Sequence, residues 1–254
     1  MGPGSHRGED RLNVGGDDRL NVGGDDRLNA TVEDRTGTEN ASTVLVISPH
    51  LDDAVYSAGA ALSAMDDVVV VTMLAGRPDP PQYTEWDRST GFASSTEAVD
   101  VRRAEDEKAV ATLGARSVHL DFLDQQYGGA DLAALIAAVS DLVEKHQPQV
   151  VIGPLGVRHA DHKVVRNAVL AAHVPVTLWM YADLPYCNVS RSDEMASRDA
   201  LRWRGCVLTP VHPPTGSMEV KRAAVECYPT QNTQFDLDNI VARERFWEIS
   251  RDLR

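Results

Sequence analysis

Cysteine, basic charge and long apolar runs are all scarce in this sequence, and each shortage excludes a class of protein. Only three cysteines occur among 254 residues, and none forms a Cys-x-x-Cys pair. An odd number without such pairs argues against a disulfide framework and favours a reducing, cytoplasmic setting. No apolar run reaches the roughly 18 residues that a membrane-spanning helix needs. The N-terminus is polar and lacks the apolar core of a signal peptide.

Acidic residues outnumber basic ones: the sequence has 38 Asp and Glu but only 25 Lys and Arg, which gives a net charge of −13. Such a surface repels phosphate backbones and anionic lipid, so it argues against nucleic-acid binding and peripheral membrane binding, while the lack of a long apolar run argues against membrane insertion. The apolar content of 43% is ordinary for a globular protein. Assembly into a homo-oligomer stays open.

An eight-residue repeat sets the start of the chain apart. The octapeptide DRLNVGGD begins at Asp10 and again at Asp18, and a third copy decays after Asp26. The repeat has too few apolar residues to bury, so we expect a flexible tail over residues 1–41. A calcium-binding β-roll, whose repeats are nine residues long, and an arm packed on a neighbouring subunit are the alternatives. Residues 42–254 are expected to form a single domain.

From Thr43 onward, strand-like and helix-like stretches alternate. The expected strands cover residues 43–48, 67–74, 116–121, 149–153, 176–181 and 205–209. The expected helices cover residues 54–65, 98–113, 130–146, 161–173, 218–228 and 238–251. This order predicts an α/β fold with a Rossmann-like, mostly parallel sheet and helices on both faces. The long connections 75–97 and 182–203 are expected to be loops that shape a pocket.

Two of the expected strand-to-helix turns carry histidine and aspartate. The first reads His50-Leu51-Asp52-Asp53, and the second reads His159-Ala160-Asp161-His162. The carboxyl ends of parallel strands meet at one edge of a sheet, where ligands bind, so we expect the turns to meet there. Histidine and carboxylate are ligands of catalytic Zn²⁺, and further such groups can move a proton or stabilise an oxyanion. The two turns together offer every group needed to hydrolyse an amide.

With these motifs the sequence resembles the PIG-L/LmbE-like family of zinc-dependent N-acetylglucosaminyl deacetylases. The first family signature is His-Pro-Asp-Asp, and here Leu51 replaces the proline, which is not a ligand. The second signature is His-x-Asp-His. The resemblance implies Zn²⁺, or another divalent metal, on His50, Asp53 and His162, with Asp52 as the general base.

The same resemblance assigns three further kinds of role. It implies His159 as oxyanion stabiliser and general-acid candidate, oriented by Asp161, and it implies that Arg102 and Asp124 hold sugar hydroxyls. Lys221 with Gln231 fits a C-terminal pattern of the family. The segment Asp183-Leu184-Pro185-Tyr186 resembles the branch that contains deacetylases of glycopeptide-antibiotic pseudoaglycones.

The expected reaction is removal of an N-acetyl or other N-acyl group from a glucosamine-containing small molecule, such as a glycopeptide antibiotic precursor. One alternative is cleavage of the amide in a glucosaminyl thiol conjugate. Another is a metal-dependent sugar-binding protein without turnover. Asp52 argues against the last alternative, because binding alone needs no base.

Simpler roles compete for several of these residues. Asp52, Asp53 and Asp161 stand where a carboxylate also caps a helix. His119 and His146 are expected to be structural, at the end of a strand and of a helix. Substrate contact is a further option for four side chains near the expected pocket: Trp86, Tyr127, Tyr186 and His212.

Overall fold

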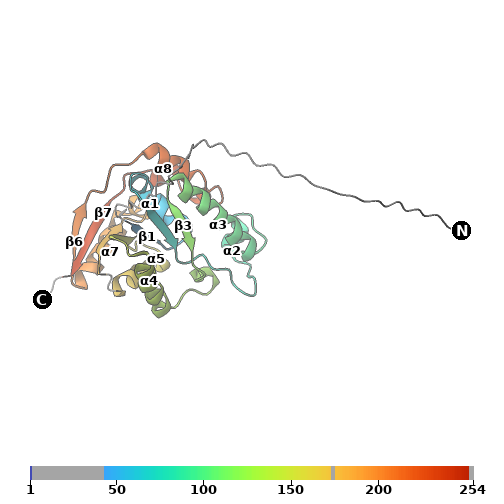
Figure 1. The fold of residues 1–254 in the computed structure, drawn as a ribbon, viewed down its shortest axis with the longest axis horizontal. Helices are drawn as coiled ribbons and strands as arrows, with labels where there is room; N and C mark the ends of the chain where they lie inside the picture. Colours follow the sequence, from blue (N-terminus) through green and yellow to red (C-terminus); the bar gives the residue numbers. More distant parts are fainter. Residues whose placement is uncertain (2–42, 173–174, 252–254) are drawn as a thin grey trace, which may run out of the picture. The chain divides into compact units, whose positions relative to one another are not determined.

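The computed structural model describes residues 43–172 and 175–251, together with Met1. The expected flexible tail over residues 1–41, with its two alternatives, therefore lies outside the described residues. Every described helix and strand belongs to one compact unit. Within this unit, helices lie on both sides of a central sheet (Figure 1).

The sheet has seven described strands in the order β3-β2-β1-β4-β5-β7-β6. The strands are β1 (Val44–Ser48), β2 (Val68–Thr72), β3 (Arg116–His119), β4 (Val150–Pro154), β5 (Thr177–Tyr181), β6 (Cys206–Val211) and β7 (Phe246–Arg251). The first five pair in parallel, and β7 runs antiparallel between β5 and β6. The mostly parallel α/β fold predicted from the sequence is confirmed.

The helices cover both faces of the sheet. They are α1 (Asp53–Leu62), α2 (Glu85–Ser89), α3 (Ser95–Thr112), α4 (Leu132–His146), α5 (Ala160–Ala171), α6 (Tyr186–Val189), α7 (Arg191–Trp203), α8 (Met218–Val225) and α9 (Leu237–Ile240), with 3₁₀ turns η1 (Gln125–Tyr127) and η2 (Asn232–Gln234). In Figure 1, α1, α3 and α8 lie on one side of the sheet, and α4 and α5 lie on the other. In the described part of the chain, no helix has both the length and the apolarity needed to cross a membrane.

The strand order explains where a ligand can bind. β1 and β2 are buried along their whole length, as expected for apolar strands covered on both faces. From β1 the chain moves outward to β2 and β3, and it then returns to the other side of β1 to form β4 and β5. Neighbouring strands whose connections leave in opposite directions create a crevice at their carboxyl ends. Here that crevice lies between the ends of β1 and β4.

Two sequence predictions about the C-terminal half are wrong. The helix expected over residues 238–251 ends at Ile240, and its second half is strand β7. Phe246, Trp247 and Ile249 favour a strand, and the place between β5 and β6 gives this segment hydrogen-bond partners on both sides. The loop expected over 182–203 contains α6 and the long helix α7.

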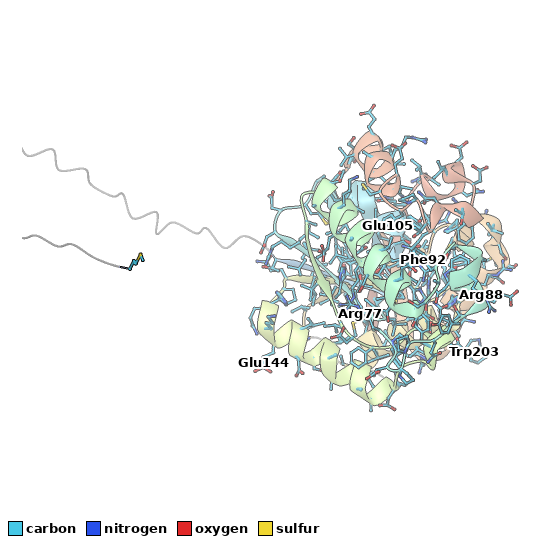
Figure 2. All side chains as sticks on the ribbon, turned by 90° about the vertical axis from the view of Figure 1, so that its right-hand side faces the viewer. Arg77, Arg88, Phe92, Glu105, Glu144 and Trp203 are labelled. Carbon is cyan, nitrogen blue, oxygen red and sulfur yellow. The ribbon has the colours of Figure 1, made fainter. Side chains whose placement is uncertain are left out.

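Helix α7 escaped prediction because its buried face is small and mostly polar. Glu194, Ser197 and Leu201 are its buried residues, whereas Trp203 at its end is 90% exposed and projects from the surface in Figure 2. Its local signals are an N-cap, Ser190, and the ion pair Arg198–Glu194 at helical spacing. The helix α2 likewise interrupts the loop expected over 75–97.

Candidate metal centre and catalytic site

The first motif forms the turn between β1 and α1. The Ser48 hydroxyl donates to the His50 carbonyl at 2.8 Å and accepts the Ala54 backbone N–H at 3.1 Å, which fixes both ends of the turn. Asp52 occupies the N-cap position, but its carboxylate makes no capping hydrogen bond. The capping alternative is therefore wrong for Asp52. Its side chain instead lines a cavity at the carboxyl edge of the sheet.

The Asp53 carboxylate lies between two imidazoles. Its Oδ2 atom is 3.1 Å from His50 Nδ1 and 3.1 Å from His162 Nε2. His162 Nε2 is buried, and among the described residues it has no hydrogen bond of good geometry. A buried ring nitrogen without a hydrogen bond, beside a carboxylate and a second imidazole, is suited to bind a metal ion. Two His and one Asp form a ligand set that Zn²⁺ accepts. The three predicted ligands therefore fit a divalent cation.

The two ring nitrogens of His50 face opposite sides of the site. Nδ1 faces Asp53, whereas Nε2 lies 3.1 Å from Asp161 Oδ2 and 3.9 Å from Asp124 Oδ2. Two groups of donor atoms within 4.8 Å of one another share this histidine: His50 with His159 and His162, and His50 with Asp124 and Asp161. A histidine that binds metal through one nitrogen donates the N–H of the other to a carboxylate or carbonyl. The second group therefore fits hydrogen bonding to the predicted ligand His50.

Negative charge dominates the cluster. Burial lowers the pKa of His162, but Asp53 and Asp183 outweigh it and raise that pKa to about 9. Burial raises the pKa of Asp53, but His162 and His50 hold it well below its ordinary value. Burial and the charge of Asp53 raise the pKa of Asp52 to about 8. Such a cluster gains from a bound dication, which would also favour the ionised form of Asp52.

The second motif forms the start of α5, in which His159 is the N-cap and Asp161 and His162 lie in the first turn. The Nδ1 atom of His159 accepts the backbone N–H of Asp161 at 3.2 Å, so the neutral ring carries its proton on Nε2. Burial and the neighbouring His50 and His162 lower the pKa of His159, which favours this neutral form. The Asp161 carboxylate is 3.9 Å from His159 Nδ1 but only 3.1 Å from His50 Nε2. Asp161 thus contacts His159 mainly through its backbone.

A cavity of about 490 Å³ opens over these groups, a size typical of small-molecule sites. Its lining includes Asp52, His159 and both predicted sugar contacts, Arg102 and Asp124. Its aromatic lining residues are Tyr56, Trp86, Tyr127, Tyr186 and Phe235. His212 lines a different cavity, beside β6, and so does not join this site.

The two predicted sugar contacts differ in how free they are. The Arg102 guanidinium is 5% exposed and donates to Asp87 at 2.8 Å and to Thr90 at 3.0 Å, while its buried Nε–H has no partner among the described residues. Asp124 caps η1 and accepts from Gln126, yet it is more exposed than Arg102. Both line the cavity, and hydrogen bonds to Asp87 and Thr90 use two of the five Arg102 N–H donors.

Two further residues belong to the site, although the sequence motifs gave neither a role. Asp183, in the loop after β5, lies 2.6 Å from His162 Nδ1. Gln231 donates its side-chain amide to the Leu51 carbonyl inside the first motif. The available signal for Asp183 is its position, since it is an acidic residue that follows a buried strand at the same sheet edge as both motifs. His119, expected to be structural, pairs with the buried Asp106 at 2.8 Å outside the cavity.

The comparisons with known proteins support the family resemblance and the fold. The family described as PIG-L, GlcNAc-PI de-N-acetylase, matches residues 45–173, which include both motifs. The A40926 pseudoaglycone deacetylase Dbv21 is 27% identical with a TM-score of 0.67, over 84% of this chain and 98% of that one. The zinc-inhibited form of the teicoplanin deacetylase Orf2 is 26% identical with a TM-score of 0.67, over 84% and 99%.

A more distant likeness extends the fold beyond deacetylases. GalB, the 4-carboxy-2-hydroxymuconate hydratase of Pseudomonas putida, is 17% identical with a TM-score of 0.57, over 84% of this chain and 98% of that one. At this identity the likeness shows the fold alone. None of the curated proteins compared matches the chain.

Proposed function

The chain belongs to the PIG-L family of GlcNAc-PI de-N-acetylases, and on this premise we propose that it is a metal-dependent hydrolase that removes an N-acetyl or related N-acyl group from the glucosamine of a glycosylated natural product. The observation that carries the proposal is the position of Asp52. Its carboxylate lines the cavity beside the ligand set, caps no helix, and receives no hydrogen bond from a described residue. A protein that only bound sugar would have no use for such a base.

Each polar group of the site then has a chemical task. Zn²⁺ bound by His50, Asp53 and His162 would polarise the amide carbonyl and lower the pKa of water. Asp52 accepts a proton from the attacking water and returns it to the amine nitrogen as the C–N bond breaks. His159 donates its Nε2–H to the oxygen on which negative charge develops. The products are the free amine and acetate.

The substrate class is proposed from the relatives and the cavity. Dbv21 and Orf2 carry names that describe deacetylases of A40926 pseudoaglycone and of teicoplanin. The cavity here joins Asp124 and the buried Arg102 to aromatic side chains such as Trp86 and Phe235, which suits a sugar attached to an aromatic aglycone. We therefore propose a glycopeptide antibiotic precursor as the substrate.

The decisive experiment follows acetate release by the full-length, zinc-loaded chain. Three substrates are compared: a glycopeptide N-acetylglucosaminyl pseudoaglycone, an N-acetylglucosaminyl thiol conjugate, and free N-acetylglucosamine. We expect the pseudoaglycone to be deacetylated with the highest kcat/KM. Turnover confined to the thiol conjugate would contradict the proposed substrate, and sugar binding without acetate release would contradict an enzymatic function.

A separate variant tests the assignment of Asp52 as the general base. We expect Asp52→Asn to lower kcat by about 10²–10⁴-fold, because the proton of the attacking water loses its acceptor, while bound zinc and thermal stability stay at the wild-type level. The matched control is Asp66→Asn, at an exposed position after α1, which should keep full activity. A wild-type rate for the Asp52→Asn variant would disprove the assignment.

The cellular setting and the tail belong to the same proposal. Cys187, Cys206 and Cys227 are unpaired, which supports a reducing, cytoplasmic compartment. We also propose that residues 42–254 form the catalytic domain and that the repeat-containing residues 1–41 form a separate tail. Zinc is proposed from the donor set, and activity measured with Zn²⁺, Co²⁺ and Fe²⁺ distinguishes it from other divalent metals.

A further inference from the structure

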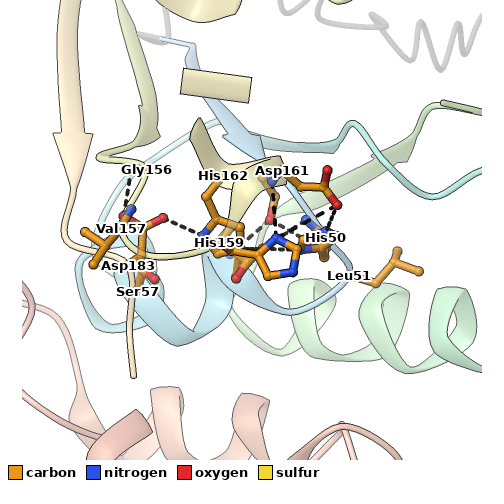
Figure 3. Close-up of polar contacts among 12 residues, drawn as sticks. His50, Leu51, Ser57, Gly156, Val157, His159, Asp161, His162 and Asp183 are labelled. Carbon is orange, nitrogen blue, oxygen red and sulfur yellow. Dashed lines mark hydrogen bonds and ion pairs between the residues drawn. The ribbon is translucent and has the colours of Figure 1, made fainter. Parts of the chain in front are cut away.

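Asp183 is a completely buried carboxylate directly behind the metal centre. Its Oδ1 atom lies 2.6 Å from His162 Nδ1, and Oδ2 accepts the backbone N–H groups of Gly156 at 2.9 Å and Val157 at 3.1 Å (Figure 3). It therefore links the loop after β5 to the loop that leads from β4 into the second motif. Removing a charged carboxylate from water is costly, and three N–H donors offset that cost here.

The position of Asp183 is fixed from more than one side. Its carbonyl accepts the backbone N–H of Cys187 at 3.0 Å, and the next residue, Leu184, donates its N–H to the Ser57 hydroxyl of α1 at 3.0 Å. Tyr186, one turn further on, packs against the His162 ring with the ring centres 5.5 Å apart. The carboxylate therefore meets His162 in a rigid setting.

An ionised carboxylate can only accept hydrogen bonds, so it selects one form of its partner. Facing Asp183, His162 must carry a proton on Nδ1. In the neutral ring, Nε2 then keeps its lone pair, and this is the nitrogen that lies 3.1 Å from Asp53 Oδ2 without a good hydrogen bond. The hydrogen bond at one nitrogen thereby prepares the other for a metal.

We propose that Asp183 is a positioning residue, which holds His162 in the Nδ1–H tautomer and so raises the affinity of the site for its divalent metal. The inference rests on the proposed ligand set His50, Asp53 and His162. It adds a residue outside both motifs whose effect passes through His162, without contact with the substrate.

Asp183→Asn separates this role from simple packing. The two backbone N–H groups of Gly156 and Val157 require an oxygen, so the amide oxygen of Asn occupies the place of Oδ2. The amide NH₂ then faces His162 Nδ1 and favours the tautomer protonated on Nε2, the nitrogen needed by the metal. Shape and backbone contacts are kept, while the wrong tautomer is selected.

The chain offers a matched control in Asp106→Asn. Asp106 is 2% exposed and lies 2.8 Å from His119 Nε2, so this is also a buried Asp–His pair. His119 is not a proposed ligand. A loss of stability from removing a buried carboxylate should therefore occur in both variants, whereas a loss of metal affinity should occur only at Asp183.

The test measures zinc affinity of the full-length proteins by competition with a chromophoric chelator. We expect Asp183→Asn to bind zinc about 10–100-fold more weakly than the wild type, and Asp106→Asn to bind it equally well. We also expect excess zinc to restore much of the Asp183→Asn activity, since weaker binding is overcome by mass action. Equal affinity of the Asp183→Asn and wild-type proteins, or an equal loss in both variants, would overturn the inference.

A second measurement needs no variant and covers the case in which Asp183→Asn fails to fold. Side-chain ¹⁵N–¹H NMR of the zinc-loaded wild type should show His162 protonated on Nδ1. If His162 were protonated on Nε2 with zinc bound, the role of Asp183 would be wrong but the proposed metal site would stand. If the wild type bound no zinc, both the proposed metal site and the role of Asp183 would be wrong. The two failures are therefore distinguishable.

Discussion

His159 differs from the other two histidines of the site in what holds its ring. Carboxylates face the second nitrogen of His50 and of His162, whereas a backbone N–H faces Nδ1 of His159. A carboxylate partner strengthens a metal ligand, and a backbone donor leaves a neutral ring that donates from Nε2. The three imidazoles are close enough to share an ion, but their hydrogen-bond partners favour the proposed roles of two ligands and one donor.

This division predicts the behaviour of His159→Phe. The variant keeps a ring of similar size but loses the Nε2–H donor, so we expect kcat to fall by about 10²–10³-fold while bound zinc stays at one ion per chain. Acetate release and metal content of the purified protein check both parts. His212→Phe, in the other cavity, is the control and should keep its activity. Loss of zinc from the His159→Phe protein would instead make His159 a ligand.

The sequence predicted the residues of the two motifs but not their hydrogen-bond partners. A motif shows residue types at a fixed spacing, so the resemblance of both motifs to the family signatures was enough to predict roles for His50, Asp52 and His162. The pairing of Asp161 with His50 depends on how the two turns face each other across β1 and β4. Asp183 comes from a third loop, in a segment to which the sequence gave no metal-site role, so only the folded sheet edge brings it to His162.

At the level of helices and strands, prediction succeeded where one apolar pattern decided the structure. The buried strands β1 and β2 and the helix α4, capped by Asp131, lie close to their expected positions. Prediction failed for β7, because this segment forms a strand through its pairing with β5 and β6. It failed again for α7, whose buried Glu194 is paired with Arg245 from the segment before β7. Both errors concern segments stabilised by contacts distant in the sequence.

The packing of α8 against α1 gives a prediction at the same scale. Lys221 of α8 is completely buried, and its Nζ lies 2.9 Å from Glu244, which also accepts the Ala60 and Ala61 N–H groups of α1. Lys221→Met leaves that carboxylate without its counter-charge, so we expect the free energy of unfolding to fall by about 3–5 kcal/mol. Urea denaturation measures the loss.

The neighbouring Arg222→Met is the control for this measurement. Arg222 pairs with the exposed Asp238 at 3.8 Å, a contact that solvent weakens, so we expect a change within about 0.5 kcal/mol. If Lys221→Met were no less stable than Arg222→Met, the buried pair would not contribute to the packing of α8 on α1.

Across the described fold, the metal centre and the apolar core occupy different places. The core is formed by β1, β2 and β4 with the helices on both faces, and these strands are almost entirely buried. The proposed ligands lie beyond the strand ends, in the turn after β1 and in the first turns of α1 and α5, which the reversal of strand order brings together. We therefore expect the hydrophobic core to form without the metal.

Metal removal tests this separation. We expect a chelator to abolish acetate release while far-UV circular dichroism and cooperative thermal unfolding are retained. Zinc at about 100 times its dissociation constant adds about 2.7 kcal/mol by mass action, so the metal-free protein should unfold about 5–10 °C lower. Restored zinc should recover both activity and Tm. Loss of the circular dichroism signal on chelation would show instead that the metal is needed to build the sheet, as in small zinc-dependent domains.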